Sequence, residues 1–264
     1  MEITHKGSRI FYTDQGKGSP IILIHGFLEN STMWEILLPF LVKKHRVICI
    51  DLLGHGKTEC LGYIHTMQDF SETVHAVINE LHLNQVIIIG HSMGGYVGIA
   101  FAKAYPEKVN ALCLLNSTPE ADHEERKQLR LRANQMAKTQ FEQLIRMSFI
   151  NLFDPASKEI YHDDIAVALD HALQTPVQGY IASNEGMRLR EDATTFWKNA
   201  SFKRGMILGE KDWIIDASKQ KEKFASYIEH FSIIKGGHMS HISNRDAMIM
   251  DILNFLDITT HRIT

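Results

Sequence analysis

One stretch of the sequence constrains the fold more than any other: residues 86–95, which read Val-Ile-Ile-Ile-Gly-His-Ser-Met-Gly-Gly. Its unbroken apolar run predicts a strand buried on both faces, and small residues then follow at helical spacing. Between them, Gly-x-Ser-x-Gly predicts a sharp turn in which Gly90 and Gly94 let the helix pass close to the strand. Ser92 would expose its hydroxyl at the tip of this turn. The backbone N–H of Met93 would lie at a helix N-terminus, where an anion is stabilised.

Other short apolar runs alternate with helical patterns along the chain. The runs at 21–24, 47–50 and 111–115 are too short for helices and predict buried strands. Residues 34–41 and 67–81 carry apolar side chains at spacings of three and four, which is typical of a helix with one buried face. The alternation predicts an α/β fold with a mostly parallel sheet covered by helices on both faces.

The alternation is interrupted between residues 119 and 200, where no strand-like run occurs and 135–153 has helical periodicity. The strand pattern resumes at 206–208 and ends at 231–234, before a final helical pattern. We therefore expect a core domain with a helical insertion that lies over the sheet. The expected boundaries are 1–118 and 201–264 for the core and 119–200 for the insertion.

Charge and composition argue against several classes of partner. The 264 residues carry a formal net charge of −3 without a basic stripe, so nothing favours nucleic acid or an anionic membrane surface. Three cysteines are an odd number, as in a reducing compartment, and no signal-like N-terminus or run of 18 apolar residues is present. We expect a cytoplasmic protein that acts on a small molecule and binds no nucleic acid or membrane. The sequence leaves the oligomeric state open.

The ends of two later strands carry groups that can activate a serine. A serine hydroxyl needs a base to remove its proton, and a carboxylate must hold that base in one tautomer. Glu210 and Asp212 follow one predicted strand, and His238 and His241 follow the last. Because the carboxyl ends of parallel strands meet in one crevice, these side chains would lie near Ser92.

Five motifs in this order resemble those of the α/β-hydrolase family across nearly the whole chain. They are His25-Gly26-Phe27, Asp51 to Gly56, Gly90 to Gly94, Gly209 to Asp212 and Gly237-His238. The resemblance implies Ser92 as nucleophile, Asp212 as the orienting acid and His238 as general base. It also implies an oxyanion hole formed by the backbone N–H groups of Phe27 and Met93.

Two of these assignments have alternatives in the sequence. Glu210 could replace Asp212, but Asp212 occupies the loop position of the family's acid. His241 could replace His238, but His238 directly follows the double glycine at the strand end. We therefore favour Asp212 and His238.

The resemblance further implies that the insertion is the family's cap, whose apolar side chains can line a pocket. The residues that we predict to line it are His25, His91, Met147, Phe149 and Trp213. No Cys/His cluster has metal-ligand spacing, and no glycine-rich loop has the pattern that cradles phosphate. We expect no metal and no cofactor.

The predicted function is carboxylic ester hydrolysis, with small to medium acyl chains transferred to Ser92 and then to water. Haloalkane dehalogenases and epoxide hydrolases carry aspartate at the nucleophile position, so Ser92 argues against both. The alternatives are a C–C bond hydrolase or a MenH-like lyase with the same triad, or a ligand-binding receptor on this fold. The lyase would need cationic side chains, for which the insertion offers Arg146, Arg188 and Arg190.

Overall fold

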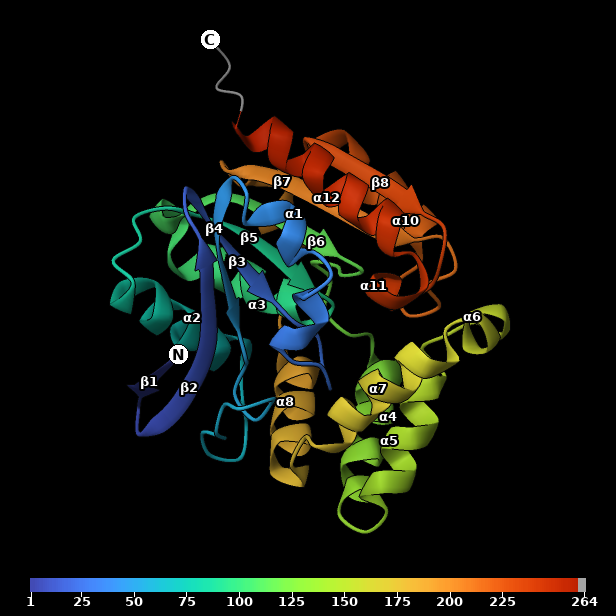
Figure 1. Cartoon of the computed structure of the whole chain (residues 1–264). Coiled ribbons are helices and arrows are strands. Elements are labelled where there is room, and N and C mark those ends of the chain that lie inside the picture. The colour runs from blue at the N-terminus through green and yellow to red at the C-terminus, as the bar shows by residue number, and fades with distance from the viewer. Residues whose placement is uncertain (261–264) are drawn as a thin grey trace.

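A mostly parallel sheet runs through the centre of the molecule in the computed structural model, which describes residues 1–260 (Figure 1). In this part of the chain the sheet has eight strands in the order β1-β2-β4-β3-β5-β6-β7-β8. Their bounds are β1 (Glu2–His5), β2 (Ser8–Gly16), β3 (Ser19–Ile24), β4 (His45–Ile50), β5 (Val86–His91), β6 (Val109–Leu115), β7 (Lys203–Gly209) and β8 (His230–Ile234). Among these strands the antiparallel pairs are β1–β2 and β2–β4 and the other pairs are parallel, so the predicted fold class is confirmed.

Alternate residues of the central strands point to opposite faces of the sheet and pack in two separate hydrophobic layers. Ile22 and Ile88 point to the face covered by α2 (Met67–Glu80), α3 (Met93–Ala104) and α10 (Ala217–Phe224). Leu23 and Ile89 point to the opposite face, which is covered by α1 (Leu38–Leu41) and α12 (Arg245–Thr260). Because both faces are buried, the strands are apolar throughout, as the sequence indicated.

The predicted helix at 34–41 is broken in the structure. It consists of a 3₁₀ turn, η1 (Ser31–Trp34), followed by the single turn of α1. Pro39 stands near the start of α1, where its missing N–H leaves no helical acceptor unpaired. The apolar face is still buried, since Trp34, Leu37 and Leu41 are all inaccessible to solvent.

Six helices and no strand occupy the chain between β6 and β7. They are α4 (Glu124–Ala137), α5 (Phe141–Ile150), α6 (Pro155–Ile160), α7 (His162–Leu173), α8 (Val177–Leu189) and α9 (Thr194–Asn199). The predicted helical stretch 135–153 is divided between α4 and α5, because Gln140 adopts φ −136° and ψ 43°, outside the helical region. Helices α4 to α8 gather to one side of the sheet (Figure 1).

The helices α4, α5, α7 and α8 share a small core of their own. Ile145 and Phe149 of α5 pack with Leu169 of α7, and Leu28 and Met239 from the loops of the sheet join the same cluster. The helical segment is therefore packed against the loops that follow β3 and β8. A division of the chain at residues 119 and 200 into core and insertion stays a prediction.

Short helical turns complete the described chain: η2 (Pro106–Lys108), η3 (Ala225–Tyr227) and α11 (Ser240–Ser243). Among residues 1–260, none of the helices combines the length and the apolarity needed to cross a lipid bilayer.

Phe255 of α12 provides a test of this packing. Its side chain is 0% exposed, so Phe255→Ala should lower the free energy of unfolding by about 3–5 kcal/mol through lost contacts and a new cavity. Phe40, which is 46% exposed, is the matched control, and its substitution by alanine should cost no more than about 0.5 kcal/mol. Urea denaturation would measure both. Equal losses in the two variants would contradict the packing of α12 on the sheet.

Candidate active site

The turn between β5 and α3 holds Ser92 in a strained conformation. Its φ is 49° and its ψ is −114°, a region that L-residues rarely adopt. Close backbone approach explains the flanking glycines: a Cβ on Gly90 would lie 2.3 Å from the carbonyl oxygen of Gly94. A Cβ on Gly94 would lie 2.2 Å from the carbonyl oxygen of Ile24 in β3. The strand, the sharp turn and the helix that the sequence predicts are all present.

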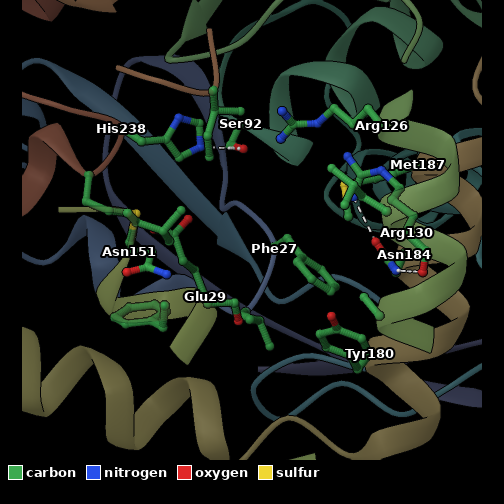
Figure 2. Close-up of a pocket in the computed structure, with 18 of the residues that line it drawn as sticks. Phe27, Glu29, Ser92, Arg126, Arg130, Asn151, Tyr180, Asn184, Met187 and His238 are labelled. Carbon is green, nitrogen blue, oxygen red and sulfur yellow. Dashed lines mark hydrogen bonds between the residues drawn. The ribbon is translucent and has the colours of Figure 1, made fainter. Parts of the chain in front are cut away.

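Ser92, His238 and Asp212 form a hydrogen-bonded chain, of which Figure 2 shows the bond between Ser92 and His238. The Oγ of Ser92 lies 2.9 Å from Nε2 of His238, and Nδ1 of His238 lies 2.7 Å from Oδ2 of Asp212. If Nδ1–H donates to the carboxylate, Nε2 is left as the acceptor for the serine proton. The three groups come from the ends of β5, β7 and β8.

The carboxyl group of Asp212 is held in its ionised form. Burial alone would raise its pKa, but His238, the amide of Asn116 and the backbone N–H of Ile215 together lower the pKa below its usual value. Ile214 N–H also donates to Oδ1, at 2.8 Å. The carboxylate is thus fixed in the orientation that a histidine partner needs.

The alternative acid and base lie elsewhere. Glu210 is exposed to solvent at the start of the loop, whereas Asp212 is buried against His238. His241 is buried, with its Nε2 3.5 Å from Oε1 of Glu29. The geometry favours Asp212 and His238 over both alternatives.

The two N–H groups predicted for the oxyanion hole lie on either side of the serine loop. Met93 is the first residue of α3, so its N–H has no acceptor one turn earlier in the helix. Phe27 follows Gly26, where a Cβ would lie 3.2 Å from Cβ of Ser92. The loop after β3 therefore passes directly beside the nucleophile. The assignment of these donors stays a prediction.

Sequence reasoning missed Asn116, which links the acid to the histidine loop. Its Nδ2 donates to Oδ2 of Asp212 at 3.0 Å and to the carbonyl of Gly237 at 3.3 Å. Its Oδ1 accepts from Oγ of Ser240 at 2.8 Å. Asn116 directly follows β6, so the rule that singled out the other strand ends could have found it.

Sequence reasoning also missed Glu29, a buried carboxylate between the loop after β3 and His91. Its Oε2 accepts from the N–H of Gly26 at 2.6 Å and lies 2.7 Å from Nδ1 of His91. Burial would raise the pKa of Glu29, but mainly His91 lowers it to about 2. No local pattern marks Glu29, because its partner is 62 residues away in the chain.

A cavity of about 360 Å³ opens beside Ser92 and His238. It lies between the loops of the sheet and α4, α5 and α8. Its lining includes Phe27, Tyr96, Arg126, Arg130, Phe149, Tyr180, Asn184, Met187 and Trp213 (Figure 2). The volume lies near the lower end of the range for small-molecule sites, about 300–1,000 Å³.

Of the five residues predicted to line the pocket, His91, Phe149 and Trp213 contribute to this cavity, and His25 and Met147 do not. His25 is fully buried behind the loop, where Nε2 accepts from the N–H of Leu52 at 2.9 Å and Nδ1 lies 2.7 Å from the carbonyl of Gly26. Met147 is 57% exposed, because it lies on the face of α5 opposite its buried residues. The prediction for these two residues was wrong.

The three arginines considered for a lyase lie outside the cavity lining. Arg146 pairs with Glu142 at 2.8 Å and Arg188 with Glu185 at 2.5 Å, each within its own helix. Arg190 pairs with Asp122, at 2.9 Å. Two other arginines, both from α4, line the cavity instead: Arg126 and Arg130.

Comparison with known proteins identifies the family. Residues 19–245 match the family model described as alpha/beta hydrolase fold. The chain belongs to the α/β-hydrolase family.

Two curated α/β-hydrolase relatives match part of the chain. One is 2-hydroxy-6-oxo-6-(2'-aminophenyl)hexa-2,4-dienoic acid hydrolase of Metapseudomonas resinovorans, 37% identical over 110 residues, or 40% of this chain and 38% of that protein. The other is (E)-2-((N-methylformamido)methylene)succinate hydrolase of Acinetobacter baylyi, 31% identical over 122 residues, or 46% of each chain. The chain thus matches less than half the length of either relative.

Among solved α/β-hydrolase structures, a thermophilic esterase from Thermogutta terrifontis has a TM-score of 0.93 over 99% of this chain and 100% of its own. Its sequence identity is 24%, so the likeness concerns the fold.

Substituting each of the two candidate acids by its amide, one at a time, would test which of them belongs to the triad. Asp212→Asn should slow phosphonylation of Ser92 by a fluorophosphonate probe by about 10³-fold, because the amide favours the wrong tautomer of His238. Glu210→Gln should leave the rate within about twofold, since its side chain is exposed. Intact-mass kinetics would follow both reactions. A larger loss in Glu210→Gln would assign the acid to Glu210.

Proposed function

We propose that this α/β-hydrolase is a carboxylesterase that cleaves esters of small to medium acyl chains through an acyl-enzyme on Ser92. The observation that supports the proposal is the chain of hydrogen bonds from Ser92 through His238 to Asp212 at the wall of a cavity. The volume of about 360 Å³ favours a small substrate. No step of the proposed reaction requires a cofactor or a metal.

In the proposed mechanism, Oγ of Ser92 attacks the ester carbonyl while Nε2 of His238 takes the hydroxyl proton. The carboxylate of Asp212 stabilises the imidazolium that forms. The negative oxygen of the tetrahedral intermediate accepts hydrogen bonds from the N–H groups of Phe27 and Met93. As the intermediate collapses, Nε2 of His238 gives its proton to the leaving alcohol, and water then repeats the sequence to release the acid.

We also propose that residues 119–200 act as the cap of the site. Helices α4, α5 and α8 supply much of the cavity wall, including Arg126, Phe149 and Tyr180. Such a wall would restrict the size of the acyl group and limit the access of bulk water.

The three cysteines are unpaired, which supports a cytoplasmic location.

Hydrolysis of p-nitrophenyl acetate, butyrate and octanoate tests the role of Ser92 as nucleophile. Wild-type protein should show sustained turnover and a transient mass increase equal to the acyl group, and Ser92→Ala should lose at least about 10³-fold in kcat. Ser226→Ala, in the exposed turn η3, is the control and should keep wild-type rates. Octanoate should be the poorest of the three substrates because of the small cavity.

Two results would contradict the esterase. Equal inertness of wild type and Ser92→Ala would exclude ester turnover, and a single acylation that then stalls would favour a ligand-binding receptor.

A second candidate function is hydrolysis of a substrate that carries a carboxylate, by ester or C–C bond cleavage with the same triad. Arg126 and Arg130 line the cavity, and Figure 2 shows the guanidinium of Arg126 pointing into it. Asp122 lies 2.5 Å from Arg130 but 3.7 Å from Arg126, so Arg126 is the less engaged of the two. Both relatives described above are named as hydrolases of carboxylic acids, a hexadienoic acid and a succinate.

A pair of esters tests this candidate. Arg126→Gln should lower kcat/KM for p-nitrophenyl hydrogen succinate by about 10-fold or more relative to the neutral p-nitrophenyl valerate, because a charge-assisted hydrogen bond is lost. Arg146→Gln, an exposed arginine outside the cavity lining, is the matched control and should leave the ratio unchanged. An equal effect of Arg126→Gln on both esters would count against an anion site.

A further inference from the structure

We propose that Glu29 and His91 form a buried carboxylate–imidazolium pair that positions the oxyanion loop and His238 for reaction. The inference rests on the proposed function only in one respect: ester hydrolysis is the reaction for which the pair would position these groups. The pair lies close to Ser92 at the wall of the cavity, since His91 precedes the serine and Glu29 lies in the loop that carries Phe27. Neither side chain is more than 5% exposed.

The pair connects three loops from different strand ends. Oε2 of Glu29 accepts from the N–H of Gly26 at 2.6 Å, which fixes the loop after β3. The same oxygen lies 2.7 Å from Nδ1 of His91, at the end of β5. Nε2 of His91 lies 3.0 Å from the backbone carbonyl of His238, after β8. Glu29 and His91 thus hold the oxyanion loop, the serine turn and the histidine loop in one network.

The chemistry of these partners determines the protonation of His91. A backbone carbonyl only accepts hydrogen bonds, so Nε2 must carry a proton. An ionised carboxylate also only accepts, so Nδ1 must carry one as well. With both nitrogens protonated, the ring is an imidazolium, and Glu29 is its counter-ion.

The surroundings of the pair support this assignment. Burial alone would lower the pKa of His91, but the charge and hydrogen bond of Glu29, with the carbonyl of His238 and the charge of Asp212, raise it above its usual value. His241, whose ring lies 5.5 Å from that of His91, stays neutral because burial lowers its pKa to about 4. Burial likewise lowers the pKa of His25.

Glu29, His91 and the nearby His241 are residue types that bind metals, but their ligand atoms are not spaced as they are around a metal ion. Ligand atoms of Glu29, His91 and His241 all lie within 4.8 Å of one another. With tetrahedral bonds of about 2.0 Å, ligand atoms around zinc are about 3.3 Å apart. The 2.7 Å between Glu29 and His91 is instead a charge-assisted hydrogen bond, so a proton occupies the position.

Loss of the pair should affect the chemical step more than substrate binding. Glu29 acts through Gly26 on the orientation of Phe27, and His91 acts through the backbone of His238 on its ring. Small displacements of such groups from reacting geometry reduce rates strongly. Both are positioning residues, because neither contacts the bond that is cleaved.

A double-mutant cycle tests the pair. Glu29→Gln and His91→Gln should each lower kcat for p-nitrophenyl butyrate by about 10-fold or more with KM within about threefold, and the double variant should be no worse than the poorer single one. The matched control is His230→Gln, at the start of β8, which removes a partly buried histidine whose Nε2 lies 3.4 Å from Oδ1 of Asp251. His230→Gln should keep the wild-type kcat. Additive losses, or a change confined to KM, would overturn the proposal.

A second measurement keeps the test independent of folding and of the reaction. Long-range ¹H–¹⁵N spectra of wild-type protein at pH 7.5, where free histidine is mostly neutral, should show one imidazole with both nitrogens protonated. This signal should be absent from His91→Gln, and a neutral His91 in wild type would overturn the proposal. The proposal would also be overturned if purified wild-type protein held one zinc ion per chain and Glu29→Gln did not bind it. If wild type hydrolysed no ester but showed the doubly protonated ring, the proposed function would fail and the ion pair would stand.

Discussion

The close approach of α3 to the strands β3 and β5 is the constraint on which the rest of the site depends. Gly94 packs against the carbonyl of Ile24 with no room for a side chain, and this approach forces Ser92 into its strained backbone conformation. Hydrogen bonds to β6 and to the segment after it hold that conformation: Ser92 N–H donates to the carbonyl of Leu115, and Ser117 Oγ donates to the carbonyl of Ser92. The position of the serine hydroxyl therefore depends on the correct pairing of β5 with its neighbours β3 and β6.

Buried charge around the site is arranged in compensated groups. Asp212 faces His238, Glu29 faces His91, and Asp122 is shared between Arg130 of α4 and Arg190, which follows α8. An unpaired ion would be costly in such surroundings, so each charge requires its partner and fixes its position. His25 is instead buried as a neutral ring, without a carboxylate contact. Its Nε2 accepts a hydrogen bond from a backbone N–H, which a neutral imidazole can do.

The parts of the fold and site that could be predicted are those encoded by neighbours in the chain. Apolar runs identified the sheet, and the Gly-x-Ser-x-Gly turn, followed by groups at later strand ends, predicted that Ser92, Asp212 and His238 lie together, as their hydrogen bonds show. Residues whose roles arise from distant contacts were not predictable this way. Glu29 and Asn116 carry no local signature, and His25 and Met147 were misplaced because strand-end position and apolarity do not say which way a side chain points.

The helical segment between β6 and β7 serves the sheet as well as the cavity. The two strands are parallel neighbours, so the chain must return from the carboxyl end of β6 to the amino end of β7, and α9 buries Trp197 in the layer beside α10 on the way. Helices α4 to α8 are an elaboration of a crossover that the topology already requires. Changes in the lengths of α4 and α5 would reshape the cavity wall, whereas α8 also buries Met187 in the core beside the sheet. The shape of the cavity and the integrity of the sheet therefore depend on different parts of this segment.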